Sequence, residues 1–394
     1  MIFPPVLQIP DPILHIARSL ERAGFEAWCV GGSLRDRLLG HPQSDFDLAT
    51  SATPQEVQRL FPRTVAVGVK YGTVGVLDRD RVLHEVTTFR RDVSTDGRHA
   101  VVQYGVSLDD DLARRDFTIN AIAYHPLRHE WRDPFSGKQD LEARLIRAVG
   151  NPAHRFAEDY LRILRALRFS ARFGFAIDPE TWSAAQAAAP GLKRLSAERV
   201  RDEWFKGLQT AKSVLQFASL WRDAGAASVW IPELDQDEKH TSPEPPVSVR
   251  DPVLLTALLT RTPSTVLRRL KASNAEIERA SAIERGPEQP TESSPIAVRR
   301  WLSLIGPAAA DLAALWKLRR GKEPAWSPVV EEIRERGDPL TRGDLAVSGN
   351  DVQALGASGP EVGRVLSALL DQVLEEPSRN QRELLLHQAR KLLQ

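Results

Sequence analysis

Two aspartates separated by one phenylalanine, Asp45 and Asp47, are the residues of this sequence best suited to metal chemistry. In a strand, side chains two positions apart point to the same face, so both carboxylates would project together. Two like charges at that distance repel, and a bound cation relieves the repulsion. Carboxylate oxygens suit Mg²⁺, which binds one or two carboxylates together with substrate phosphates. The alternative interpretation is a solvated pair at the edge of a sheet.

A glycine turn, Gly31-Gly32-Ser33, precedes the two aspartates. It separates an apolar stretch, Glu26–Val30, which predicts a strand, from Leu34–Leu39, which predicts a helix. Free N–H groups at the start of a helix suit a phosphate group, and Arg35 adds positive charge. Such a turn is by itself more often a plain connection, but together with the aspartates it favours a nucleotide site.

A third carboxylate would complete a site for two metal ions. Glu85 is the candidate, because it lies in an otherwise apolar stretch, Arg81–Thr88, predicted to be a strand near Asp45. A glutamate facing solvent fits the sequence equally well. Residues 65–67 and 73–77 complete the predicted sheet, so that about the first 130 residues form a mixed α/β region.

The remaining sequence shows helical periodicity, interrupted by a polar, proline-bearing stretch, Asp235–Arg250, that predicts a linker. With 394 residues, the chain is long enough for several packed units. Its 53 Lys and Arg nearly balance its 52 Asp and Glu, so any basic surface must be local. The single cysteine, Cys29, excludes a disulfide framework and a cysteine zinc site. No signal peptide and no apolar stretch long enough for a membrane span are found, so a cytoplasmic location is expected.

Arginines recur at helical spacing within residues 155–175. Arg165, Arg168 and Arg172 would share one face of a helix, because residues three and four positions apart are neighbours there. Such a stripe either contacts RNA phosphates or is simply solvated. The spacing is compatible with both.

Residues 31–50 and 112–123 (LARRDFTINAIA) resemble the first two motifs of class II nucleotidyltransferases, the CCA-adding enzymes and bacterial poly(A) polymerases related to DNA polymerase β. In that family the second motif binds the ribose and the triphosphate. The resemblance therefore implies this role for Arg114, Arg115, Asp116 and Asn120. Arginine forks match phosphate oxygens, and Asp or Asn can bind ribose hydroxyls.

Residues 158–162 (EDYLR) resemble the family's fourth motif, which implies that Asp159 and Arg162 read the incoming base. Asp159 can only accept hydrogen bonds and Arg162 can only donate them. Cytosine and adenine each offer an amino donor beside a ring-nitrogen acceptor, whereas uracil and guanine present the reverse pattern. A wrong base would leave buried polar groups unpaired, at a cost of about 1–3 kcal/mol per group. The family usually has Pro where this chain has Tyr160.

Three further stretches resemble parts of the same family. Residues 89–103 resemble the flexible loop with which CCA-adding enzymes switch from C to A, and their length favours A addition. Residues 195–208 resemble the fifth motif, with Ser196 as a helix cap, and are expected to brace the neck helix. Residues 345–370 resemble the tail that lies near the tRNA elbow.

The prediction is an α+β protein with a mixed-sheet nucleotidyltransferase head (residues 1–139) and an elongated all-helical remainder. That remainder comprises a neck (140–212), a body (213–340) and a tail (341–394). The resemblance implies Mg²⁺-dependent addition of C, C and A from CTP and ATP to the 3′ end of tRNA, and no protein partner is inferred. The expected site residues are Asp45 and Asp47 as metal ligands, Glu85 as a third catalytic carboxylate, and Gly32, Ser33, Arg35, Arg114, Arg115, Asp116, Asn120, Asp159, Arg162, Arg165 and Arg168 for the nucleotide. The alternatives are a poly(A) polymerase, a CC-only or A-only enzyme, and a catalytically dead tRNA-binding protein.

Overall fold

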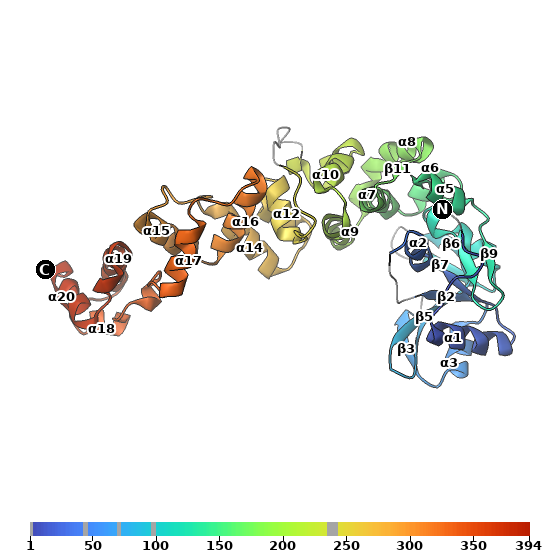
Figure 1. The fold of residues 1–394 in the computed structure, drawn as a ribbon, viewed down its shortest axis with the longest axis horizontal. Coiled ribbons are helices and arrows are strands. Elements are labelled where there is room, and N and C mark those ends of the chain that lie inside the picture. The colour runs from blue at the N-terminus through green and yellow to red at the C-terminus, as the bar shows by residue number, and fades with distance from the viewer. Residues whose placement is uncertain (1–2, 42–45, 69–71, 96–99, 235–242) are drawn as a thin grey trace. The chain divides into compact units, whose positions relative to one another are not determined.

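The computed structural model describes residues 3–41, 46–68, 72–95, 100–234 and 243–394. The chain divides into two compact units, Met1–Asp235 and Gln236–Gln394. The first unit contains a sheet and the helices that follow it, and the second is helical throughout its described part (Figure 1). The expected linker therefore begins at the boundary between the units.

A seven-stranded mixed sheet forms the centre of the head, within the described residues, in the order β3-β4-β5-β2-β1-β8-β9. Strands β2 and β5 run parallel, and the other neighbouring pairs are antiparallel. The mixed sheet expected from the sequence is confirmed. The strands are β1 (Ala27–Val30), β2 (Asp47–Thr50), β3 (Thr64–Gly68), β4 (Thr73–Leu77), β5 (Leu83–Thr88), β8 (Ala123–His125) and β9 (Glu130–Arg132).

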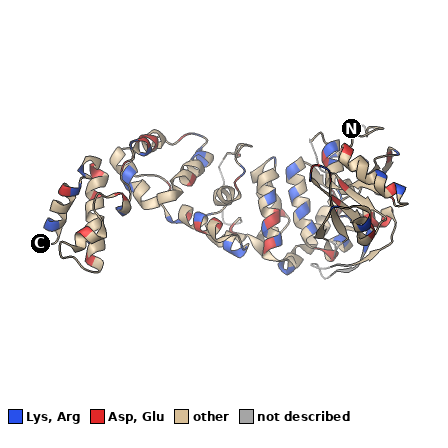
Figure 2. Cartoon of the chain, turned by 90° about the horizontal axis from the view of Figure 1, so that it is seen from below, with Lys and Arg blue, Asp and Glu red and all other residues tan. Residues whose placement is uncertain are grey.

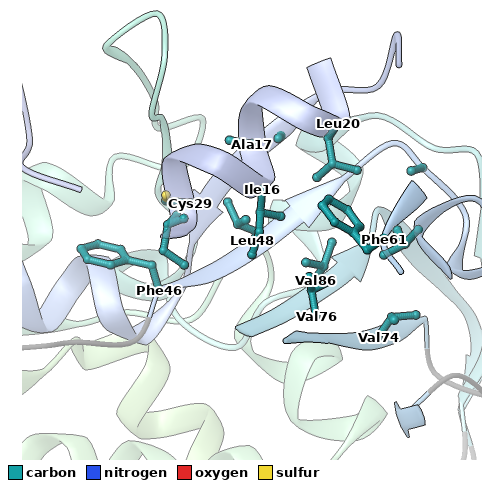
Figure 3. Packing of buried hydrophobic residues seen from close by; sticks show 14 of the residues in the cluster. Ile16, Ala17, Leu20, Cys29, Phe46, Leu48, Phe61, Val74, Val76 and Val86 are labelled. Carbon is teal, nitrogen blue, oxygen red and sulfur yellow. The ribbon is translucent and has the colours of Figure 1, made fainter. Parts of the chain in front are cut away.

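One face of this sheet is covered by helices α1 (Asp11–Arg22) and α3 (Pro54–Leu60). Alternation along β4 and β5 directs Val74, Val76 and Val86 to this face, where they pack against apolar residues of both helices (Figure 3). Cys29 is buried in the same cluster, as expected. Burial raises the pKa of its thiol well above the usual range, with a smaller contribution from Asp47, so the thiol stays protonated.

The opposite face is covered only over the inner strands. Helix α4 (Leu108–Ala113) contributes Leu108 and Leu112 to a cluster with Trp28 and Val30 of β1. That cluster contains no residue of β3, β4 or β5 among the described residues. The outer three strands therefore have a second face that this core leaves open.

Residues 89–103, expected to be a flexible loop, include two paired strands. Strands β6 (Arg90–Thr95) and β7 (Ala100–Tyr104) form an antiparallel hairpin. The stretch is rich in valine and threonine, which favour strands. At the base of the hairpin, Tyr104 lies against Gly72, where a Cβ atom would come within 2.8 Å of the tyrosine ring.

The neck helices follow the sheet within the same unit. Helix α7 packs against α9, and its Phe169 and Phe173 join Phe117 and Ile119 of the head in one apolar cluster. A two-residue parallel pair, β10 with β11, lies within the neck, which was expected to be all-helical. The elements are α5 (Gly137–Ala143), β10 (Leu145–Ile146), α6 (Pro152–Glu158), α7 (Leu161–Phe173), β11 (Ala176–Ile177), α8 (Pro179–Ala188), α9 (Ala197–Thr210), α10 (Val214–Asp223) and α11 (Ala226–Trp230).

The second unit is built from helices α12 to α20, and its described residues contain no strand. Arg299 of α15 is buried and donates to the carbonyls of Leu374 and Glu375, which end α19. None of the helices in the described part of the chain is both long and apolar enough for a membrane span. The longer helices are α12 (Pro252–Leu259), α14 (Asn274–Arg285), α15 (Pro295–Ile305), α16 (Ala309–Arg320), α17 (Ser327–Arg336), α19 (Pro360–Glu375) and α20 (Arg382–Leu392), and the shorter ones are α13 (Pro263–Arg269) and α18 (Gly349–Gln353).

Candidate active site

A cavity of about 620 Å³ in the first unit is lined by residues of the sheet, the second motif and the neck. Most of the expected site residues line it, namely Gly32, Arg35, Asp47, Glu85, Arg114, Arg115, Asp116, Asn120, Asp159, Arg162, Arg165 and Arg168. Ser33 is buried behind the cavity lining, and Asp45 lies outside the described residues. Residues distant in sequence are thus brought to one place.

The sheet wall of the cavity, defined here as Asp47, Thr73, Glu85 and Thr87, carries its carboxylates. Leu48 of β2 is paired with Val86 of β5, so Asp47 and Glu85, one residue earlier on each strand, hold matching positions. Thr73 and Thr87 face each other across β4 and β5, with their hydroxyl oxygens 3.0 Å apart. The structure therefore places Glu85 beside Asp47 rather than at the periphery.

The glycine turn is required by close contacts. Gly31 has φ +82°, and a Cβ atom there would lie 2.9 Å from Nη1 of Arg115 and 3.7 Å from Oδ2 of Asp47. The Ser33 hydroxyl donates to the carbonyl of Val30 at 3.4 Å and so closes the turn that begins α2 (Gly32–Leu38). Glycine is favoured at residue 31 by its backbone conformation, with φ +82° and ψ −146°, and a side chain there would also displace the end of Arg115.

Arg35 is held by protein groups on all sides. Its Nε donates to Oδ1 of Asp36 at 2.8 Å, and its Nη1 donates to Oδ1 of Asn120. The guanidinium lies over the rings of Phe169 and Phe173, 4.8 Å from each centroid. Burial lowers the pKa of Arg35, although Asp36 acts against this shift. In this structure Arg35 connects the glycine turn to the neck helix.

The two arginines of the second motif are oriented by a buried carboxylate that sequence reasoning missed. Asp111 accepts from Nε of Arg114 at 2.9 Å and from Nη2 of Arg115 at 3.3 Å. Burial raises the pKa of Asp111, but the two arginines lower it by more, so that it lies below the usual range. Nε of Arg115 is buried and has no hydrogen-bond partner among the described residues. The available signal for Asp111, in α4, was its spacing of three and four residues from Arg114 and Arg115, which follow the end of that helix.

Asp116 joins the second motif to the neck. It accepts from Nδ2 of Asn120 at 2.8 Å and from Nε of Arg165 at 2.7 Å. Burial raises the pKa of Asp116, but Arg165 and Asn120 lower it by more, so that the carboxyl stays ionised.

The neck wall of the cavity, defined here as Asp159, Arg162, Arg165, Arg168, Arg172 and Arg199, is dominated by paired charges. Arg168 donates to Oε2 of Glu203 at 2.6 Å, and Arg172 donates to Oδ2 of Asp36 at 2.6 Å. Residues of both charges occur along the helices of this unit (Figure 2). Each member of the arginine stripe has an internal carboxylate partner, so the stripe is not a free basic surface, although the side chains of Arg165 and Arg172 remain 33% and 26% exposed.

The two base-reading candidates are also held by neighbours. Asp159 accepts from the Leu161 N–H at 3.0 Å and from Nη2 of Arg199 at 2.7 Å. Arg162 donates to Oε2 of Glu158 at 2.6 Å and to the carbonyl of Arg155 at 3.0 Å. The acceptor and the donor are therefore positioned by neighbouring groups of the protein itself.

Comparison with known proteins agrees with this geometry. Residues 27–147 match the poly A polymerase head domain, and residues 174–238 match the probable RNA and SrmB-binding site of polymerase A. The CCA-adding enzyme of Streptococcus mutans is 34% identical over 400 residues, covering 96% of each chain, and that of Geobacillus kaustophilus is 37% identical over 405 residues, covering 95% of each. This chain belongs to the class II CCA-adding enzyme and poly(A) polymerase family. It is a nucleotidyltransferase.

Solved structures of the family share the fold. The Bacillus stearothermophilus CCA-adding enzyme in complex with CTP is 32% identical, with a TM-score of 0.80, and the match covers 97% of this chain and 98% of that one. The Thermotoga maritima CCA-adding enzyme complexed with tRNA is 20% identical, with a TM-score of 0.65, and the match covers 98% of this chain and 96% of that one. At that identity the likeness shows the fold alone.

CCA-adding enzymes generally use a divalent metal ion, and the sheet wall fits one. Asp47 and Glu85 offer only oxygen donors, which suit a hard cation. Among the described residues no cluster of three His, Cys, Asp or Glu side chains could hold a metal ion. Asp45, the remaining carboxylate of the expected set, is not among them.

Four further residues of the cavity lining were not anticipated: Arg90, Arg199, Thr73 and Thr87. Arg199 lies in the fifth-motif stretch, whose expected role was only to brace the neck. Ser196, three residues earlier, occupies the N-cap position of α9 but makes no side-chain capping bond. Arg199 could have been suspected because it lies one helical turn after that cap.

Proposed function

We propose that this chain adds C, C and A, from CTP and ATP, to the 3′ end of tRNA and releases pyrophosphate. One observation carries the proposal. A single cavity contains the sheet carboxylates Asp47 and Glu85, the arginine pair of the second motif, and the acceptor–donor pair Asp159 and Arg162. The first group suits nucleotidyl transfer, the second binds triphosphate, and the third distinguishes C and A from U and G.

Asp47, together with Asp45 and assisted by Glu85, would hold Mg²⁺. A magnesium ion held there would lower the pKa of the attacking 3′-hydroxyl and would neutralise charge that develops on the phosphate oxygens. The two carboxylates would also help to orient the 3′ end of the tRNA. Their strands, β2 and β5, are held in place because Leu48 and Val86 are buried under α1. The 3′-hydroxyl of tRNA attacks the α-phosphate of the nucleotide.

Arg114 and Arg115 are proposed to bind the triphosphate. Asp111 fixes both guanidinium groups, so little side-chain entropy is lost when phosphate binds. Gly32, Ser33 and Arg35 would shape the turn beneath the phosphates, and Asp116 and Asn120 would contact the ribose. Arg165 and Arg168, paired with Asp116 and Glu203, would line the nucleotide side of the cavity.

Asp159 and Arg162 are proposed to read the base. Arg199 holds the Asp159 carboxylate and Glu158 holds the Arg162 guanidinium. The acceptor atoms of Asp159 and the donor atoms of Arg162 therefore keep a fixed distance from each other. A base with an amino donor beside an acceptor nitrogen matches that spacing. The body and tail would bind the tRNA away from its 3′ end, and a cytoplasmic location is inferred.

The decisive experiment offers purified protein a tRNA lacking CCA, with CTP, ATP, UTP or GTP in turn and then with CTP and ATP together. We expect C incorporation from CTP alone and a stop after three nucleotides with CTP and ATP. A long A tail from ATP alone would instead identify a poly(A) polymerase, to which the head-domain match also points. A stop after C and C, or A addition only to a tRNA ending in CC, would identify a specialised enzyme. No pyrophosphate release with any nucleotide would identify a binding protein without catalysis.

A further inference from the structure

The outer strands of the head sheet leave an apolar surface uncovered. Val65 and Val67 of β3 and Leu83 of β5 are 41%, 46% and 37% exposed, although they lie in strands. The other face of β4 and β5 is buried under α1 and α3 (Figure 3), whereas β3, at the edge of the sheet, is exposed along its middle. Large exposed apolar side chains gathered on one face often mark a binding surface.

This surface is continuous and borders the catalytic cavity. Gly75 of β4 is paired with Val65 on one side and with Glu85 on the other. A Cβ atom at Gly75 would lie 2.8 Å from both Val67 Cγ2 and Leu83 Cδ1, so these two side chains close over the glycine. We call Val65, Val67, Gly75 and Leu83 the acceptor face. This face meets the cavity at Glu85, which lies beside Gly75 and lines the cavity.

Three arginines lie at the end of this face that is remote from the cavity. Arg63 precedes β3, and Arg79 and Arg81 lie in the turn between β4 and β5. All three are exposed, and none forms an ion pair within the described part of the chain. Arg81 has φ +63°, a conformation that favours glycine or asparagine. Arg81 thus occupies a position where glycine or asparagine would be less strained.

The chemistry of the cavity indicates what approaches over this face. If the nucleotide base lies on the neck wall against Asp159 and Arg162, the attacking hydroxyl must reach the α-phosphate from the side opposite the leaving pyrophosphate. Thr73, Glu85 and Thr87 border the cavity on the sheet side. The acceptor strand would therefore pass over β4 and β5.

We propose that the acceptor face binds the single-stranded 3′ end of the RNA acceptor. Its bases lie on Val67 and Leu83, its phosphates meet Arg63, Arg79 and Arg81, and its terminal hydroxyl reaches Glu85. Apolar contact with bases and cationic contact with phosphates are the two elements with which proteins hold single strands. The inference rests on the proposed function, since it requires an RNA acceptor.

The apolar part is tested with the double variant Val67→Ser/Leu83→Ser. Its KM for a tRNA lacking CCA should rise about tenfold, because contacts to about one base are weakened. Its KM for CTP and its preference for C over U should stay unchanged. The matched control is Val6→Ser, which alters a side chain 56% exposed in the same unit, beside Leu7 of the α1 cluster. An unchanged KM for tRNA in the double variant would overturn the inference.

The charged part is tested with Arg79→Ala/Arg81→Gly, which should fold readily because both positions are exposed. The salt dependence of tRNA affinity should become shallower, by about 0.7 in the logarithmic slope for each phosphate contact removed. An unchanged slope would contradict phosphate binding at these arginines. This variant also keeps the inference testable if the serine variant fails to fold.

A direct test places a photoreactive base next to the 3′ terminus of the tRNA. Cross-links to residues 65–67 or to Leu83 are expected, whereas cross-links confined to the neck would overturn the inference. A second copy of the chain is the alternative occupant of this face, and sedimentation at increasing protein concentration tests for it. If the wild type forms dimers that the serine variant lacks, and the KM for tRNA is unchanged, the face is a self-association surface instead. If the wild-type protein adds no nucleotide, the proposed function fails; if it adds CCA and the variants match it, only this inference fails.

Discussion

Asp47 and Glu85, on the sheet wall of the cavity, come from neighbouring strands, whereas the neck wall presents four arginines of α7 and Arg199 of α9. Those arginines are bound to carboxylates of other elements: Arg165 to Asp116, Arg168 to Glu203 and Arg172 to Asp36. The sheet wall thus brings negative charges together, and the neck wall compensates its positive charges internally. Reaction chemistry and substrate selection are therefore expected to fail separately when one wall is altered.

The largest effect is expected on the sheet wall. Asp47→Asn should lower turnover by at least about a hundredfold, because loss of a metal ligand removes several kcal/mol of stabilisation from the transition state. CTP binding and thermal stability should change little. Glu130→Gln on β9 is the control, since this carboxylate lies outside the cavity. Turnover near that of the wild type would show that the sheet wall is not the reaction site.

A buried ion pair on the neck wall should dominate stability. Glu203→Ala leaves Arg168, whose side chain is 9% exposed, without its carboxylate. The free energy of unfolding should fall by about 3–5 kcal/mol, as when one partner of a buried pair is removed. Chemical denaturation measures this loss. Asp202→Ala, on the same helix but in an exposed pair with Arg201, should cost no more than about 1 kcal/mol. Equal losses would contradict the structural role of the buried pair.

A smaller effect is expected from Arg199, which positions Asp159 without being an expected base contact. Arg199→Ala removes a charge-assisted hydrogen bond of 2.7 Å, so preference for C and A over U and G should fall about tenfold. The rate at which the variant incorporates U from UTP and G from GTP measures this loss of preference. Arg199→Lys should restore part of the preference, and Arg201→Ala, on the same helix, should leave it unchanged. A merely structural role would lower stability without altering base choice.

The smallest effect is expected on the stability of the protein at acid pH, where Asp116 becomes protonated. Because the folded pKa of Asp116 lies below the unfolded value, its contribution to stability is complete above the unfolded pKa of about 3.9 and is lost as the pH falls toward the folded pKa. Below about pH 4 the wild type should lose stability more steeply than Asp116→Asn, by up to about 1.4 kcal/mol per pH unit. Near neutral pH the two slopes should coincide. Equal slopes in acid would show that Asp116 is not the ionised partner of Arg165.

The strands of the head could be predicted because local patterns determine them. Alternation in residues 73–77 and 83–88 reflects a face buried under α1, and the structure confirms both strands. The hairpin of β6 and β7 was missed because the resemblance to a flexible loop was given more weight than its valine and threonine content. Strand order could not be read from the sequence, since the parallel pairing of β2 with β5 joins segments separated by a helix and two strands.

For the site, the residue types within short motifs were sufficient to predict which side chains line the cavity. They were not sufficient to predict the hydrogen-bond and ion-pair partners of those side chains. Arg165 and Arg168 could be assigned to the cavity, whereas Asp116 and Glu203, which hold them, are 49 and 35 residues away in sequence. Helical spacing alone suggested solvent or RNA as the neighbour of these arginines. Contacts between distant segments therefore limited the prediction more than local chemistry did.

Tyr160, at the position where relatives usually carry proline, has a further consequence. Its ring occupies the space beside Gly191, where a Cβ atom would come within 2.1 Å of it, and Arg194 lies 5.7 Å above the ring. Positions 160 and 191 are therefore expected to be coupled: a larger residue at 191 requires the tyrosine ring to move or to be replaced. Homologues with alanine or a larger side chain at 191 should thus carry a small residue at 160. In such lineages, the order in which the two substitutions occurred would be constrained.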